Sequence, residues 1–346
     1  MARTILWGSL ALAPLTIGLH YLAHLPEALE FGLAALALIP LAWLIGEATE
    51  HAAHHTGPGI GGFLNATFGN ALELIIALFA VNAEKFEVVR GSLSGSVIGN
   101  LLLVLGFSLL FGGRGTIDRQ STFVSLGLVA LAVLLFLIPA VPALDGDPER
   151  HSIAQLGIAP SVVLLLVYVG VTYAALRRHR LTHVSDEPAL LRAWSLRRSL
   201  VVLAAATIVT ALIAEIVVGT IDDFADDAGL SDFFVAAVIV AIVGNAAEHG
   251  GAVVVAYRGR IRLAAEIALA SSAQVAVFLI PAVALLAWLL EPLALSFRPV
   301  ELVAVGASVL LTAGLLAQGR SSRARGVVLI LAYVGLAVAF FIAGDR

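Results

Sequence analysis

The chain has 346 residues, of which 60% are hydrophobic and 13% are charged, and its formal net charge is −4. Soluble globular proteins carry about 25% charged residues, so this composition excludes an ordinary soluble domain and indicates several membrane spans. The sequence contains no cysteine, which excludes disulfides, thiolate metal sites and cysteine nucleophiles.

Apolar stretches long enough to cross a bilayer follow one another along the chain. Backbone polar groups must be satisfied inside the hydrocarbon, which favours helices. We therefore predict an all-α integral membrane protein with about eleven transmembrane helices. The predicted spans are 5–23, 30–49, 62–81, 91–111, 121–141, 159–176, 199–219, 233–256, 263–281, 299–317 and 326–343.

Lysine and arginine residues are unevenly distributed over the connections between these spans. With the N-terminus in the cytoplasm, fifteen of them lie on the cytoplasmic side and five on the outer side. Basic residues favour the cytoplasmic side, so we predict a cytoplasmic N-terminus and an external C-terminus. We expect the protein in a prokaryotic plasma membrane, with the lipid bilayer as its surroundings and no nucleic acid as a partner.

A five-residue motif, Gly-Asn-Ala-x-Glu, occurs twice, at Gly69–Glu73 and at Gly244–Glu248. A shift of 175 residues superimposes the two copies and also places Ser96 on Ser271. Five predicted spans separate the copies, so they cross the membrane in opposite directions. Inverted repeats of this kind are typical of secondary transporters.

The repeat predicts the organisation of the chain. We expect one extra N-terminal helix followed by two inverted five-helix repeats joined by a basic cytoplasmic linker. The predicted parts are 1–27 for the extra helix, 28–176 for the first repeat, 177–198 for the linker and 199–346 for the second repeat.

Glu73 and Glu248 each place a carboxyl group inside an apolar span, where a charge costs roughly 2.5–3.5 kcal/mol. Two such residues at matching positions indicate a functional site, and a protonated, hydrogen-bonded glutamate is the structural alternative. Asn70 and Asn245 precede the glutamates by three residues, which places each pair on one helix face. Carboxylate and amide oxygens suit a hard cation such as calcium.

Further polar or flexible positions accompany the motif. Gly69 and Gly244 lack side chains, so a helix can break there and free its carbonyl oxygens. His249 either tunes proton binding at Glu248 or is a satisfied interior histidine. The predicted supporting residues in the following spans are Ser96, Asn100, Ser271, Ser272 and Gln274. The alternative for the serines is close helix packing.

Charge balance predicts how such a site works. Two ionised glutamates with one divalent cation are neutral, and two protonated glutamates are also neutral. Two ionised glutamates alone leave a charge of −2 in a poorly polarisable environment. We therefore expect the site to hold either the cation or protons, and to exchange them by alternating access. Calcium and protons are then transported substrates, and we expect no resident cofactor.

Two pairs of segments resemble the signature repeats of the calcium/proton antiporters, a branch of the calcium/cation antiporter superfamily. They are GNALELIIALFAV with GSVIGNLLLVLG, and GNAAEHGGAVVVA with ALASSAQVAVFLIP. The resemblance implies that Glu73 and Glu248 bind calcium and exchange it for protons, with calcium leaving the cytoplasm. It also implies a long sliding helix before each motif, on which Glu50 and Glu215 are candidates for gating or proton relay. The basic linker departs from the acidic stretch of many relatives.

Three other functions remain open at this point. A sodium-coupled exchanger of the same fold is one, although such relatives carry hydroxyl residues where this chain has the motif asparagine. A passive channel is another, which the inverted repeats argue against. The segment EATEHAAHHTG, at 47–57, has histidines at zinc-ligand spacing and suggests an intramembrane zinc enzyme as a remote alternative.

Overall fold

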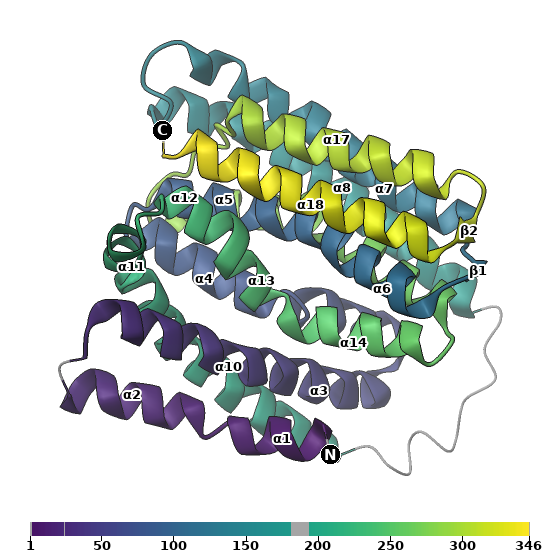
Figure 1. The fold of residues 1–346 in the computed structure, drawn as a ribbon, viewed down its shortest axis with the longest axis horizontal. Coiled ribbons are helices and arrows are strands. Elements are labelled where there is room, and N and C mark those ends of the chain that lie inside the picture. The colour runs from purple at the N-terminus through teal and green to yellow at the C-terminus, as the bar shows by residue number, and fades with distance from the viewer. Residues whose placement is uncertain (1, 24, 181–193, 346) are drawn as a thin grey trace. The chain divides into compact units, whose positions relative to one another are not determined.

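The computed structural model describes residues 2–23, 25–180 and 194–345, and these residues are almost entirely helical (Figure 1). The chain forms two compact units, and each unit combines two separate stretches of sequence. The first unit consists of Met1–Phe79 and Leu166–Phe224, and the second of Ala80–Leu165 and Ala225–Arg346. Most of the predicted basic linker, residues 181–193, lies outside the described residues. The predicted division into five-helix repeats stays a prediction.

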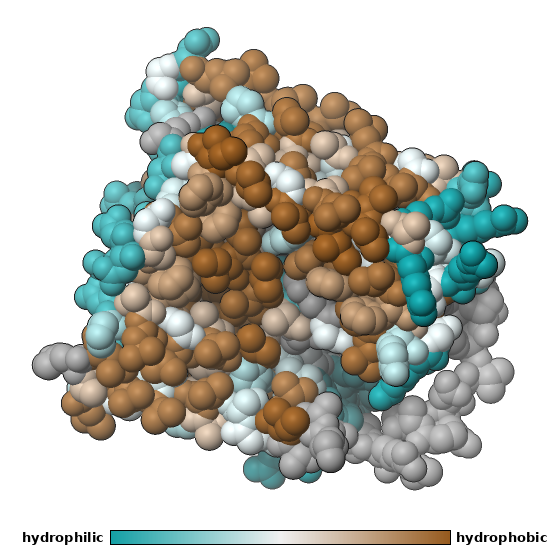
Figure 2. Space-filling model, viewed as in Figure 1, coloured by the Kyte–Doolittle hydropathy of each residue, from teal (hydrophilic) through white to brown (hydrophobic). Residues whose placement is uncertain are grey.

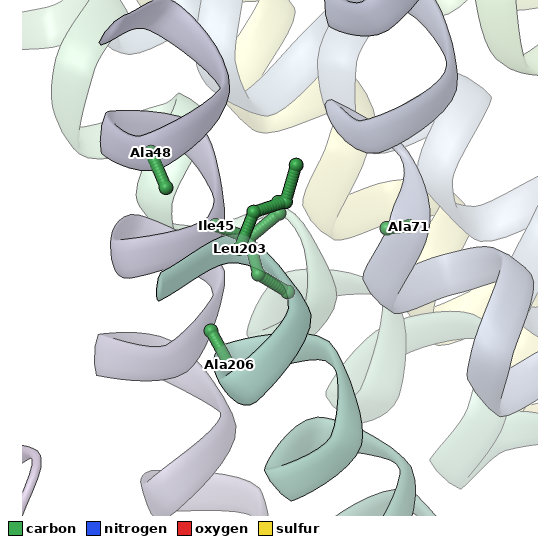
Figure 3. Packing of buried hydrophobic residues seen from close by; sticks show 5 residues of the cluster. All are labelled: Ile45, Ala48, Ala71, Leu203 and Ala206. Atoms are coloured by element: carbon green, nitrogen blue, oxygen red, sulfur yellow. The ribbon is translucent and has the colours of Figure 1, made fainter. Parts of the chain in front are cut away.

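The first unit is organised around two long helices that pack along each other, α3 and α10. Ile45 and Ala48 of α3 and Leu203 and Ala206 of α10 belong to one buried cluster, in which the two larger side chains lie between the two alanines (Figure 3). Ala71, at the start of α4, belongs to the same buried cluster. The helices that contribute to this unit are α1 (Ala2–Ser9), α2 (Leu12–Leu22), α3 (Glu27–Phe68), α4 (Ala71–Asn82), α8 (His151–Arg180), α10 (Leu196–Gly219) and α11 (Ile221–Ala228), of which α4, α8 and α11 cross into the second unit.

The second unit contains the most deeply buried helices. Its first elements are α5 (Phe86–Ile98), the π-helix η1 (Gly99–Val104), α6 (Leu105–Gly112), β1 (Gly115–Thr116), α7 (Arg119–Ala140) and the 3₁₀ turn η2 (Pro142–Leu144). Its later elements are α12 (Asp232–Phe234), η3 (Val235–Val240), α13 (Ala241–Gly244), α14 (Ala246–Tyr257), α15 (Ile261–Gln274), η4 (Val275–Leu279), α16 (Ile280–Leu286), η5 (Ala287–Leu289), α17 (Pro299–Leu316), β2 (Arg320–Ser321) and α18 (Arg323–Ala343). The two short strands pair antiparallel, with Gly115 opposite Ser321.

Close backbone approach holds α5 against η3 in this unit. A Cβ atom added to Gly95 would collide with the carbonyl group of Ala237. Only glycine therefore allows the two helices to pack at this point. Tight packing of this kind matters in a membrane protein, because the hydrophobic effect does not drive helices together in lipid.

Nine helices in the described part of the chain are long and apolar enough to cross a membrane, or ten if one bent pair counts as a single span. The two predicted spans that are missing from these nine are 62–81 and 233–256, which carry the two motif copies. Figure 2 shows the apolar surface of this type of helix: hydrophobic residues cover α17 and α18, and hydrophilic residues gather near β2. The prediction of an all-helical integral membrane protein is confirmed.

One connection differs from the expectation. The predicted spans leave residues 50–61 as a connection between two of them, but α3 continues as one helix from Glu27 to Phe68. The glycine and proline residues of this stretch lower its helix propensity, yet propensity is a weak determinant that tertiary context overrides. The helix instead ends at Phe68, directly before the motif.

Candidate functional site

Both copies of the motif interrupt a helix. Helix α3 ends at Phe68, Gly69 and Asn70 form a turn, and α4 begins at Ala71. In the second copy, α13 ends at Gly244 and α14 begins at Ala246. The glycine–asparagine pair thus breaks the helix in each copy, as the sequence predicts. Interrupted helices at membrane depth are tolerated where the freed backbone groups are buried in protein or line a cavity.

The first copy lies in the first unit. Asn70 is 1% exposed, and its carbonyl oxygen accepts a hydrogen bond from the backbone of Leu74. Glu73 is partly exposed and lies in the first turn of α4. The partial positive charge of a helix N-terminus favours a carboxylate there. The asparagine is therefore buried inside the unit, and the glutamate lies beside it at the N-terminal end of α4.

The second copy lies in the second unit and is centred on a hydrogen-bond network. The Nδ2 atom of Asn245 donates to Ser96 Oγ at 2.7 Å and to the Ala241 carbonyl oxygen at 2.9 Å. Its Oδ1 atom accepts from Asn100 Nδ2 at 3.2 Å. Asn100 Nδ2 also donates to Ser271 Oγ at 3.1 Å. The four polar residues are buried, so the network fixes Asn245 firmly at the helix break.

Asn100 contributes a further feature. It lies in the π-helix η1, and π-bulges inside α-helices are frequent at functional sites. Its Oδ1 atom is buried and has no hydrogen-bond partner among the described residues. An amide oxygen without a donor is chemically suited to a hard cation or a water molecule.

The remaining predicted residues fall into three groups. Ser272 donates to the Ala268 carbonyl oxygen of its own helix at 3.0 Å, and Gln274 is the partly buried last residue of α15. Glu248 and His249 lie in α14, and their side chains are outside the part of the chain that the structure describes. Glu50 and Glu215 are exposed on α3 and α10.

The histidine-rich segment forms separate pairs. His51 Nε2 lies 3.5 Å from Glu47 Oε1, and His54 Nε2 lies 4.0 Å from Glu50 Oε1. His55 Nε2 contacts the Trp194 carbonyl oxygen at 2.6 Å. In the described residues no three or more histidine, aspartate or glutamate side chains are placed to hold one metal ion.

Comparison with protein families decides the class of protein. The family model described as sodium/calcium exchanger protein matches residues 27–177 and 198–342. The chain belongs to this family. The two matched stretches nearly coincide with the two repeats expected from the sequence. As a member of a transporter family, this exchanger is a transport protein and not a zinc enzyme.

Known relatives cover nearly the whole exchanger. The Ca²⁺/H⁺ antiporter ChaA of Bacillus subtilis is 38% identical over 337 residues, which is 93% of this chain and 94% of ChaA. The vacuolar cation/proton exchanger 3 of Arabidopsis thaliana is 36% identical and covers 99% of this chain and 80% of the relative. The solved structure of the Ca²⁺/H⁺ antiporter protein YfkE has a TM-score of 0.82 and 35% identity, and covers 98% and 99% of the two chains.

Four charged residues of the exchanger were not anticipated. Arg90 is buried and lies 2.7 Å from a carboxylate oxygen of Glu149. Glu301 is buried in α17, where it accepts hydrogen bonds from Ser94 Oγ at 3.1 Å and from the backbone of Arg298 at 2.7 Å. The sequence feature that could have pointed to them is their position: Arg90, Arg298 and Glu301 lie at the edges of apolar spans. Polar residues at such positions normally face water.

Proposed function

We propose that this family member is a secondary transporter that exchanges Ca²⁺ for H⁺ across the membrane. Its main support is the way both motif copies interrupt a helix and bury their asparagine. Relatives that are 35% to 38% identical over at least 93% of the chain carry the name Ca²⁺/H⁺ antiporter.

Each motif residue has a proposed role. Glu73 and Glu248 bind the cation when ionised and take up protons when it leaves. Asn70 and Asn245 offer amide oxygens, and Gly69 and Gly244 allow the helix breaks. Ser96 and Asn100 support the site by holding Asn245 through hydrogen bonds, and Ser271 holds Asn100.

The proposed direction is calcium export with proton entry. It rests on the distribution of lysine and arginine, which predicts a cytoplasmic N-terminus and an external C-terminus. Glu50 and Glu215 are proposed as gating or relay residues. Both side chains are exposed, on α3 and α10 respectively.

Transport in vesicles distinguishes a proton-coupled from a sodium-coupled exchanger. The purified protein is placed in liposomes with an acidic interior, and uptake of Ca²⁺ is followed on addition of the ion outside. We expect uptake that a protonophore abolishes and that a sodium gradient does not replace. Uptake that requires sodium, or that persists after the pH gradient has collapsed, would contradict proton coupling.

A further inference from the structure

Eight arginines gather at one end of the second unit, where three connections between helices meet. The connections are 113–118 between α6 and α7, 258–260 between α14 and α15, and 317–322 between α17 and α18. Strands β1 and β2 pair the first connection with the third, and Asp118 of the first pairs with Arg262, in the first turn of α15, at 2.5 Å. The residues of this arginine cluster are Arg114, Arg119, Arg258, Arg260, Arg262, Arg320, Arg323 and Arg325.

Most of the positive charge of the arginine cluster has no internal partner. Arg262 is within ion-pair distance of two carboxylates, those of Asp118 and Glu266. The other seven arginines have no carboxylate at ion-pair distance within the described part of the chain. All members except Arg325 are exposed, and Figure 2 shows hydrophilic side chains at this end of the unit, near β2. The guanidinium groups are therefore accessible and not neutralised.

Three helices also direct their positive ends toward the cluster. Helices α7, α15 and α18 begin there, and none of them has an acidic residue in its first turn. Arg119 and Arg323 are instead the first residues of α7 and α18. The partial positive charge of a helix N-terminus disfavours an arginine and favours an anion. An anionic group against this surface would compensate both the arginines and the helix ends.

The arginine cluster lies at the edge of the hydrocarbon. Candidate membrane spans begin at Arg119, Ile261 and Arg323. Phe123 is 43% exposed and follows Arg119 by four residues, and Val327 is 42% exposed and follows Arg323 by four residues. Residues four apart lie on one helix face and about 6 Å apart along the axis. Arginines at headgroup level are therefore followed, one turn deeper, by apolar side chains that face acyl chains.

The general preference of basic residues for the cytoplasmic side does not account for this arrangement. That preference requires basic residues in the connections on one side of the membrane, but it does not require three connections to bring them to one place. Clusters of about four to eight basic residues beside a membrane span are typical of surfaces that bind anionic lipids.

We propose that the arginine cluster binds anionic phospholipid, with phosphate groups on the exposed guanidinium groups and acyl chains along α7 and α18. Guanidinium groups match phosphate in charge and offer it two parallel N–H donors. The exposed Phe123 and Val327 favour a lipid over a soluble phosphate, because a free headgroup buries no apolar surface there. The second unit alone forms this surface, and the proposal does not depend on which ion is exchanged.

Lipid titration of the purified, delipidated full chain tests the proposal. Dioctanoyl phosphatidylglycerol, dioctanoyl phosphatidylcholine and the free headgroup glycerophosphoglycerol are added separately in detergent, and binding is followed by microscale thermophoresis. We expect phosphatidylglycerol to bind at least about tenfold more tightly than phosphatidylcholine at low salt, and the ratio to fall at high salt because surface charges are screened. Equal affinity for the two lipids at low salt would overturn the proposal. Free headgroup binding as tightly as the lipid would overturn the lipid assignment.

Substitutions at the starts of α7 and α18 locate the bound lipid. The double variant Arg119→Gln with Arg323→Gln is expected to weaken phosphatidylglycerol binding by about tenfold and to leave phosphatidylcholine binding unchanged. The double variant Arg119→Lys with Arg323→Lys keeps both charges and is expected to retain most of the affinity. The exposed, uncharged neighbour Gln120 provides the control Gln120→Ala, expected to bind as the unmodified chain does.

The melting temperature of each variant shows that it is folded. Full phosphatidylglycerol affinity in the folded double glutamine variant would place the lipid elsewhere and overturn the proposal. A loss of affinity in the double lysine variant as large as in the glutamine variant would show that charge does not hold the lipid, which would also contradict it.

Discussion

Asn245 and Ser96 are 149 positions apart in sequence, yet the Asn245 amide donates to the Ser96 hydroxyl at 2.7 Å. The donors of this network run in one direction, from Asn100 to Asn245 and from Asn245 to Ser96. The Oδ1 atom of Asn100 is consequently left as an acceptor without a donor among the described residues. The network therefore holds the second motif rigidly and keeps one amide oxygen available.

Two neighbouring serines give a direct test of this network. Ser271 accepts from Asn100, whereas Ser272 bonds a carbonyl group of its own helix. Ser271→Ala is expected to lower the free energy of unfolding by about 1 kcal/mol and to raise the KM for Ca²⁺. Ser272→Ala is expected to change stability by less than about 0.5 kcal/mol and to leave the KM unchanged. Thermal unfolding and vesicle transport measure both effects, and equal effects of the two substitutions would argue against the network.

Two glycines test the close packing of α5. A Cβ on Gly95 would collide with the carbonyl group of Ala237, whereas a Cβ on Gly99 would meet nothing within 4 Å. Gly95→Ala is therefore expected to destabilise the protein by about 1–3 kcal/mol, as overpacking does. Gly99→Ala serves as the control and is expected to be neutral or slightly stabilising, because its Cβ meets nothing within 4 Å and alanine is the better helix former. Similar melting temperatures for both variants would show that α5 and η3 do not pack as described.

The α3–α10 contact offers a second matched pair. Ala206 is buried in the cluster of Figure 3, and the adjacent Ala205 is exposed. Ala206→Leu is expected to cost about 1–3 kcal/mol of stability through overpacking. Ala205→Leu is expected to change stability by less than about 0.5 kcal/mol. Unfolding of the purified variants in detergent distinguishes them, and a well-tolerated leucine at Ala206 would be inconsistent with this contact.

The sequence was informative where a local pattern has one physical meaning. Long apolar runs predicted the helices, and the glycine–asparagine pairs predicted the helix breaks at Asn70 and Asn245. The sequence did not reveal the hydrogen-bond partners of the motif. Ser271 and Ser272 are adjacent and chemically identical, and only the rotation of α15 decides which one reaches Asn100.

Buried charges were equally hard to foresee. Arg90 lies at the edge of a predicted span and Glu149 lies in the predicted connection 142–158, and a solvated side chain is the usual interpretation at both places. Their pairing depends on how the loop before α8 folds back. Arg150 determines that fold by donating to the carbonyl oxygens of Pro142, Asp145 and Asp147. The sequence alone does not reveal such a set of contacts.

The most direct test of the central claim is proton-driven Ca²⁺ uptake into liposomes by Glu73→Gln and Glu248→Gln, with Glu291→Gln as an exposed control. Glutamine retains the size and a carbonyl oxygen but can neither become charged nor take up a proton. We predict that both motif variants fold and reduce uptake to the level of empty vesicles, while the control transports normally. Proton-driven uptake at the normal rate by either folded motif variant would contradict exchange through these two carboxylates.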